Sequence, residues 1–125
     1  MTNRKRILIV DDEATIRRVL SRLLAGSGHE IMTAEDGREA LEMIQQRPPD
    51  LVLLDINMPR LGGMRLLELV KKIRPGLPVI MVTGVDDPDQ ALATMSLGAE
   101  DYVTKPFDFD YIDTAIKANL AARCV

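Results

Sequence analysis

The sequence predicts an α/β fold in which helices cover both faces of a parallel sheet. Short apolar runs that suit buried strands alternate with stretches whose apolar residues recur at helical spacing. Five such strand and helix pairs follow one another with short connections, which is the signature of a parallel sheet between two helical layers. The chain has 125 residues, and we expect residues 1–125 to form a single domain.

The first two pairs precede Pro48. The strand Ile7–Val10 leads into an amphipathic helix whose apolar residues recur at intervals of three and four. These residues are Ile16, Val19, Leu20, Leu23 and Leu24. The strand Glu30–Ala34 and the turn Asp36-Gly37 then precede a second helix, which ends before Pro48. The apolar residues of the second helix are Ala40, Leu41 and Ile44.

The third pair contains the most apolar strand. Leu51–Leu54 is an unbroken apolar run, which suits a strand buried on both faces, and Asp55 stands at its carboxyl end. A helix follows Gly62-Gly63 and ends at Pro75-Gly76. We expect this helix to bury Leu66, Leu67, Val70 and Ile73.

The last two pairs begin with the strands Pro78–Val82 and Tyr102–Thr104. Pro88 suits the first turn of the fourth helix. We expect that helix to present one apolar face, made by Ala91, Leu92 and Met95. The fifth helix is lined by Ile112, Ala115, Ile116 and Leu120. Right-handed crossovers leave few topologies, and we expect a doubly wound (βα)5 three-layer sandwich with the flavodoxin-like strand order 2-1-3-4-5.

Composition excludes several classes of protein. The net charge of -3 speaks against a surface that binds nucleic acid. No apolar stretch approaches a membrane-spanning length. The single cysteine, Cys124, cannot form an internal disulfide, which fits a reducing compartment. We therefore expect a cytoplasmic protein that contacts neither nucleic acid nor membrane directly.

Polar residues stand at the ends of four predicted strands. The expected strand order brings Asp11, Asp12 and Asp55 together, with Thr83 and Lys105 beside them. Two carboxylates about 5 Å apart repel by about 3 kcal/mol at an effective dielectric of roughly 20, so this cluster calls for a neutralising cation. Mg2+ suits carboxylate ligands with open positions for water and phosphoryl oxygens, whereas zinc favours the Cys and His that the cluster lacks.

These residues suit phosphoryl transfer. Carboxylates form aspartyl-phosphate intermediates, so Asp55 can act as a nucleophile toward phosphorus. Lys105 would share the charge of the phosphoryl oxygens with Mg2+, and the Thr83 hydroxyl would donate a hydrogen bond. Each residue also has a plainer interpretation, because acids stabilise helix N-termini, lysines are common at surfaces and threonine is common in turns. The convergence of all of them favours a site.

Four motifs resemble those of the receiver domains of bacterial two-component response regulators, in the order of that family. They are Val10-Asp11-Asp12-Glu13, Leu54-Asp55-Ile56-Asn57-Met58-Pro59, Val82-Thr83-Gly84 and Thr104-Lys105-Pro106-Phe107. The resemblance implies that Asp55 accepts a phosphoryl group from a phosphohistidine of a histidine kinase or histidine phosphotransfer protein. It also implies that Mg2+ binds to Asp12, Asp55 and the backbone carbonyl of Asn57, with Asp11 acting through a water molecule.

The resemblance further implies a conformational switch. Thr83 would move toward the phosphoryl group while Tyr102, at the position of the family's switch aromatic, turns inward. A half-buried tyrosine with a satisfied hydroxyl is the plainer interpretation of Tyr102.

The resemblance also implies that Lys105-Pro106 is a cis peptide. An output domain or effector protein would read the fourth helix, fifth strand and fifth helix, and a phosphorylation-dependent homodimer is compatible with this. Such a domain catalyses only its own phosphorylation and dephosphorylation, so we do not expect a general enzyme.

Two other classes share parts of the pattern. A phosphatase of the haloacid-dehalogenase type carries a second Asp two residues after its nucleophile, where this chain has Asn57, whose amide cannot shuttle a proton. A flavin-binding electron carrier needs hydroxyls and amides after the first strand, where Asp11-Asp12-Glu13 would repel phosphate.

Two further residues or segments depart from a simple pattern. Tyr111–Ala115 lacks the Glu-Leu-x-Ala-Arg pattern of receivers joined to winged-helix domains, which speaks against that subclass. We expect His29, in a turn, to be solvated.

Overall fold

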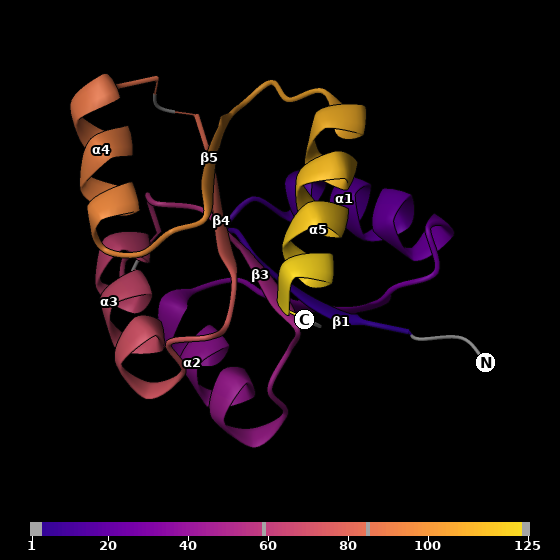
Figure 1. The fold of residues 1–125 in the computed structure, drawn as a ribbon, viewed down its shortest axis with the longest axis horizontal. Coiled ribbons are helices and arrows are strands. Elements are labelled where there is room, and N and C mark those ends of the chain that lie inside the picture. Colours follow the sequence, from indigo (N-terminus) through magenta and orange to yellow (C-terminus); the bar gives the residue numbers. More distant parts are fainter. Residues whose placement is uncertain (1–3, 59, 85, 124–125) are drawn as a thin grey trace.

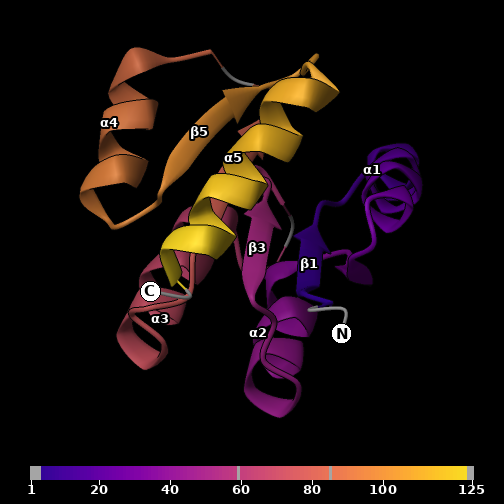
Figure 2. The ribbon, with the colours of Figure 1, turned by 45° about the vertical axis from the view of Figure 1, so that its right-hand side comes forward.

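The computed structural model describes residues 4–58, 60–84 and 86–123. Within these ranges five strands form one parallel sheet in the order β2-β1-β3-β4-β5, which confirms the predicted fold class. The strands are β1 (Arg6–Val10), β2 (Glu30–Ala34), β3 (Leu51–Leu54), β4 (Val79–Thr83) and β5 (Asp101–Thr104). The arrows of β1, β3 and β5 point the same way in Figure 2. All carboxyl ends of the strands therefore lie at one edge.

Helices cover both faces of the sheet, as Figure 1 shows. They are α1 (Ala14–Gly26), α2 (Gly37–Gln46), α3 (Gly63–Ile73), α4 (Pro88–Ser96) and α5 (Phe109–Arg123). The helices α1 and α5 lie on one face, and α2, α3 and α4 lie on the other. None of the helices in the described ranges is both long and apolar enough to cross a bilayer.

The central strand β3 contributes to the core on both sides of the sheet. All four of its residues are at most 1% exposed. Val52 and Leu54 belong to the cluster under α2 and α3, whereas Leu51 and Leu53 belong to the cluster under α1 and α5. Because successive side chains of a strand point to opposite faces, an unbroken apolar run serves both clusters.

Several helical residues expected in the core are exposed. On α1, Val19 and Leu23 are 43% and 38% exposed, and on α3 Ile73 is 46% exposed. These residues lie at the margin of an apolar stripe that is wider than the surface the sheet covers. Leu20 and Leu24, at the centre of the α1 stripe, are buried.

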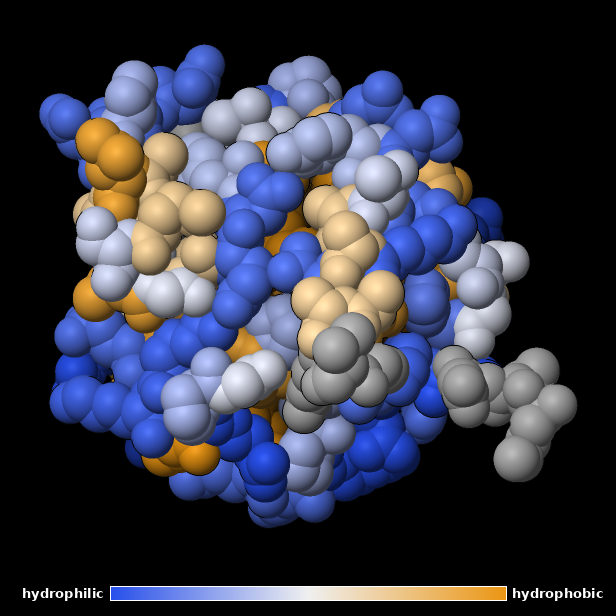
Figure 3. All heavy atoms as spheres, viewed as in Figure 1, coloured by the Kyte–Doolittle hydropathy of each residue, from blue (hydrophilic) through white to orange (hydrophobic). Residues whose placement is uncertain are grey.

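The apolar residues Leu92 and Met95, expected to share one face of α4, are both exposed to solvent. Leu92 is 68% exposed and Met95 44%, whereas Thr94 is completely buried. The Thr94 hydroxyl donates to the Ala91 carbonyl at 2.9 Å, so its polar group is satisfied within the helix. Figure 3 shows apolar surface over α4 on this side of the molecule.

Candidate functional site

The sheet register places the polar strand ends next to one another. Val10 of β1 pairs with Leu54 of β3, and the Asp55 amide donates to the Val10 carbonyl at 2.9 Å. On the other side, the Lys105 amide donates to the Thr83 carbonyl at 2.7 Å. The residues that follow β1, β3 and β5 therefore meet at one edge, as the sequence predicts.

Four carboxylates gather at this edge. Asp11, Asp12, Glu13 and Asp55 each offer a carboxylate oxygen, and these oxygens all lie within 4.8 Å of one another. Asp11 is 3% exposed and Asp55 5%, whereas Asp12 and Glu13 are exposed. Glu13 belongs to the first of the four sequence motifs but is an addition to the predicted metal ligands. Clustered hard oxygen ligands fit Mg2+ well.

Lys105 supplies positive charge inside this cluster. Its Nζ lies 2.8 Å from Asp11 Oδ2, 3.2 Å from Glu13 Oε1 and 3.7 Å from Asp55 Oδ2. The sequence suggested a divalent cation as the neutralising group, and the structure shows that a lysine already offsets part of the repulsion. The closest partner of Lys105 is Asp11 rather than Asp55.

The charged groups shift one another's titration. Burial raises the pKa of Asp55, and the negative charge of Asp11 raises it further, while Lys105 and the hydrogen bond from the Asn57 amide act in the opposite direction. Burial alone would lower the pKa of Lys105, but the hydrogen bonds and charges of Asp11, Asp55 and Glu13 together outweigh burial and raise it. Lys105 therefore stays protonated, and ionised Asp55 carries an unfavourable free energy.

Backbone amides and one arginine orient the acids. The Glu13 amide donates to Asp11 Oδ1 at 2.9 Å, and the Asn57 amide donates to Asp55 Oδ1 at 3.4 Å. Arg17 Nη1 donates to the Asp11 carbonyl at 2.6 Å. The contact of Arg17 with Asp11 was not predicted, because the helical spacing of Arg17 indicates only that it lies on the polar face of the helix. Its place one turn into the helix after the acidic motif was the available signal.

The remaining predicted residues occupy strands β4 and β5 and the loop after β5. Thr83 is fully buried at the end of β4. Tyr102 is half-buried, packs against the cluster under α2 and α3, and donates through its hydroxyl to Gln90 Oε1 at 3.3 Å. The Lys105-Pro106 bond is cis, which confirms that expectation. Gln90, on α4, was not predicted, since nothing in its local pattern marks it.

His29 differs from its expected solvated state. Its side chain is half-buried, and the buried Nε2 atom has no hydrogen-bond partner. Burial lowers the pKa of His29, the charge of Asp113 raises it, and Lys117 lowers it. His29 therefore lies near enough to Asp113 and Lys117 of α5 to be affected by their charges, which sequence proximity could not reveal.

Known proteins resemble this chain over most of its length. The response regulator receiver domain family matches residues 7–117. The probable transcriptional regulator ycf27 of Cyanophora paradoxa is 42% identical over 118 residues, covering 94% of this chain and 49% of that protein. The DNA-binding transcriptional regulator NtrC of Escherichia coli is 45% identical over 104 residues, covering 83% of this chain and 22% of that protein. The chain thus spans about half or less of these relatives' length.

Solved structures of receiver domains are also similar to this chain. The CheY-like receiver domain protein of Methanospirillum hungatei has a TM-score of 0.92 and 35% identity, with 97% of both chains covered. The receiver domain of NtrX from Brucella abortus has a TM-score of 0.88 and 40% identity, covering 92% of this chain and 98% of that one. Together with the four motifs and the acidic cluster at the strand ends, these likenesses show that the chain belongs to the response regulator receiver domain family.

Proposed function

We propose that this chain is a phosphorylation-activated switch of a two-component system in which Asp55 accepts the phosphoryl group. The observation that carries the proposal is the setting of Asp55. Its carboxylate is 5% exposed at the strand ends, lies 3.7 Å from the Lys105 ammonium, and belongs to a cluster of four acids. A carboxylate held beside a fixed cation suits attack on a phosphoryl group, whose transfer depends mainly on positioning and charge stabilisation.

The proposed donor is a phosphohistidine of a histidine kinase or histidine phosphotransfer protein. An Asp55 carboxylate oxygen attacks phosphorus, a P–O bond forms, and the P–N bond breaks with its electron pair leaving on the imidazole. Lys105 moves from Asp11 toward the phosphoryl oxygens and stabilises their charge. Water later attacks the acyl phosphate and restores the carboxylate, so the domain acts only on its own phosphorylation state.

The proposed ligands of Mg2+ are Asp12, Asp55 and the backbone carbonyl of Asn57, with Asp11 bound through a water molecule. Clustered carboxylate oxygens support this assignment. When bound, Mg2+ neutralises charge on the transferring phosphoryl group. Glu13 stands outside the proposed set because the family resemblance assigns the metal to Asp11, Asp12, Asp55 and Asn57; the Glu13 carboxylate pairs with Lys105 at 3.2 Å.

The proposed switch comprises Thr83, Tyr102, Lys105 and Pro106. The Thr83 hydroxyl donates to the new phosphoryl group, and Tyr102 leaves its 3.3 Å hydrogen bond with Gln90 to turn inward. The phosphoryl group makes more favourable contacts in the conformation with Tyr102 turned inward, so phosphorylation shifts the equilibrium toward that conformation. The face made by α4, β5 and α5 then presents a changed surface.

The proposed partners are an upstream phosphodonor and a downstream output domain or effector protein. Residues 1–125 would form one receiver domain in the cytoplasm, without contacting nucleic acid or membrane directly. A phosphorylation-dependent homodimer is a compatible mode of output. The relatives named above are described as transcriptional regulators and are much longer than this chain, which supports an output reached through a second domain.

Incubation with acetyl phosphate and Mg2+ tests the proposed function. We expect the intact protein to gain the mass of one phosphoryl group and then lose it slowly. Continuous release of phosphate without accumulation of the modified protein would indicate a phosphatase instead. Flavin that copurifies with the protein would indicate an electron carrier.

A further inference from the structure

We propose that Arg60 is a positioning residue that holds the loop between β3 and α3, and with it Asn57, in place at the phosphorylation site. This inference rests on the proposed function, in which Asn57 supplies a backbone carbonyl to Mg2+. The loop follows Asp55 directly and ends at Gly63, where α3 begins. A fixed loop would present the Asn57 carbonyl in a constant position relative to Asp12 and Asp55.

An ion pair to a fixed anchor ties the loop to α2. Arg60 Nη1 donates to Asp36 Oδ2 at 2.9 Å. Asp36 is 4% exposed, and its Oδ1 accepts a hydrogen bond from the Glu39 amide at 2.9 Å as the N-cap of α2. The carboxylate is therefore held by the helix that it caps, so an arginine bound to it is held to the start of α2.

The backbone of Arg60 points to the same role. Its φ is 62°, which makes it the one non-glycine residue with a positive φ in the described ranges. Left-handed backbone is unfavourable for a residue with a Cβ, and it persists where surrounding contacts enforce it. Arg60 makes its ion pair with the buried Asp36 carboxylate from this backbone conformation, although the arginine side chain itself is 64% exposed.

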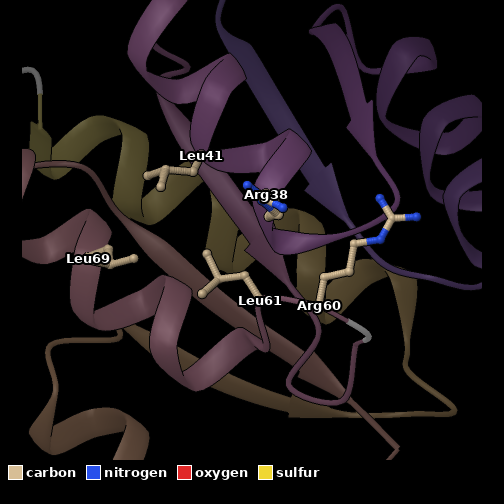
Figure 4. Close-up of a pocket in the computed structure, with 5 residues that line it drawn as sticks. All are labelled: Arg38, Leu41, Arg60, Leu61 and Leu69. Atoms are coloured by element: carbon tan, nitrogen blue, oxygen red, sulfur yellow. The ribbon is translucent and has the colours of Figure 1, made fainter.

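The next residue anchors the loop on its other side. A Cβ added to Gly37 would overlap the carbonyl oxygen and Cβ of Leu61, so the first turn of α2 lies directly against the loop. Figure 4 shows Leu61 projecting toward the side of Leu41 and Leu69, while Arg60 extends away from them. The two neighbouring side chains therefore extend in different directions: Arg60 reaches the N-cap of α2, and Leu61 lies beside α2 and α3.

Glycine at the start of α3 brings the loop back to the site. A Cβ added to Gly63 would overlap the carbonyl oxygen of Asp55 and Cα of Ile56, and the Gly63 amide donates to the Ile56 carbonyl at 2.9 Å. The start of the loop, at Asp55 and Ile56, therefore lies against Gly63. Further along the loop, Arg60 and Leu61 contact the start of α2. Loss of the Arg60 contact would leave the part that carries Asn57 tethered at fewer points.

Mg2+ titration followed by backbone-amide NMR tests this role in the unphosphorylated protein. The informative variants are Arg60→Gln, which removes the charge, Arg60→Gly, which also relaxes the backbone, and Arg60→Lys, which keeps the charge. We expect Arg60→Gln and Arg60→Gly to weaken Mg2+ binding about tenfold, the scale for groups that orient metal ligands, and Arg60→Lys to stay within about twofold of the wild type. Arg65→Gln is the matched control, since Arg65 pairs with Glu68 on α3 at 3.8 Å, and its Mg2+ affinity should be unchanged.

Thermal unfolding separates positioning from general stability. We expect Arg60→Gly to unfold at the same temperature as the wild type or higher, while it still binds Mg2+ more weakly. Wild-type affinity in both Arg60→Gly and Arg60→Gln would overturn the inference, as would an equal loss in Arg60→Lys and Arg60→Gln. Failure of the wild-type protein to give saturable Mg2+ shifts would instead contradict the proposed function.

Discussion

At the scale of single residues, the ionised form of Asp55 is energetically unfavourable in the folded protein. Its pKa is raised first by burial and then by Asp11, so the folded protein binds a proton there more tightly than the unfolded chain does. A raised carboxyl pKa gives stability at low pH that is lost as the pH rises through the folded-state value. Ionised Asp55 therefore destabilises the metal-free protein at neutral pH.

Asp55→Asn should consequently stabilise the metal-free protein at pH 7. We expect a gain of about 1 kcal/mol, or a few degrees in Tm, because the amide keeps the side-chain shape without the charge. Thermal unfolding at pH 7 and in mild acid measures this, and the gain should shrink in acid as wild-type Asp55 takes up a proton. A lower Tm for the variant at pH 7 would contradict the account.

Lys105 has the opposite effect on the cluster. Its side chain is 13% exposed and lies 2.8 Å from Asp11 Oδ2. Lys105→Ala should lower the free energy of unfolding by about 2 kcal/mol without Mg2+, because it leaves buried acids without a cation. The variant should still bind Mg2+ and recover part of its stability on binding, while losing the conformational response to phosphorylation.

Chemical denaturation with and without Mg2+ measures the effect of Lys105→Ala. Lys117→Ala is the control, because Lys117 is 65% exposed and its pair with Asp113 should contribute under about 0.5 kcal/mol. Equal losses in the two lysine variants would show that Lys105 does not offset the repulsion of the acids.

His29 predicts a separate pH dependence. Burial lowers its pKa in the folded state, so the unfolded chain takes up a proton first as the pH falls. Wild-type stability should therefore decline relative to His29→Gln as the pH falls below the unfolded value of about 6.5. Tm values of both proteins between pH 8 and pH 5 test this, and parallel curves would rule out His29 as the source.

At the scale of elements, β3 and α4 differ most in what the sequence discloses. The apolar run of β3 predicts burial on both faces, and the structure confirms it. In α4 the spacing of Leu92 and Met95 predicts that they share an apolar face, but it is Thr94 that is buried, while Leu92 and Met95 are exposed. Helical periodicity locates a stripe but not the direction in which it faces, so tertiary packing decided the outcome.

Two leucine substitutions test that contrast. Leu53 is 1% exposed and Leu92 is 68% exposed. Leu53→Ala should cost about 3 kcal/mol through lost burial and a residual cavity, whereas Leu92→Ala should change stability by less than about 0.5 kcal/mol. Urea denaturation of both variants gives the comparison. A similar cost for Leu92→Ala would mean that α4 packs differently in solution.

At the scale of the whole molecule, the sequence predicts the strand order and the gathering of polar residues at one edge of the sheet, because both depend on chain order. Each residue that follows a parallel strand lies at the same edge, so Asp11 and Asp55, on neighbouring strands, must approach one another once the order is known. Lys105 lies at the same edge, and its long side chain reaches the two acids. Sequence could not predict contacts that need tertiary packing. Arg17 on the Asp11 carbonyl and Arg60 on Asp36 are examples, since neither residue belongs to a motif.

The central claim is that the acids at this edge bind Mg2+ and ready Asp55 to carry phosphorus. Peptide mapping after treatment with acetyl phosphate tests it most directly, using the wild type, Asp55→Asn and the control Asp113→Asn, each with Mg2+ or with EDTA. We predict a phosphoryl group on Asp55 in the wild type and in Asp113→Asn, only when Mg2+ is present, and none in Asp55→Asn. Equal labelling in EDTA, or labelling of Asp55→Asn at the wild-type level, would contradict the claim.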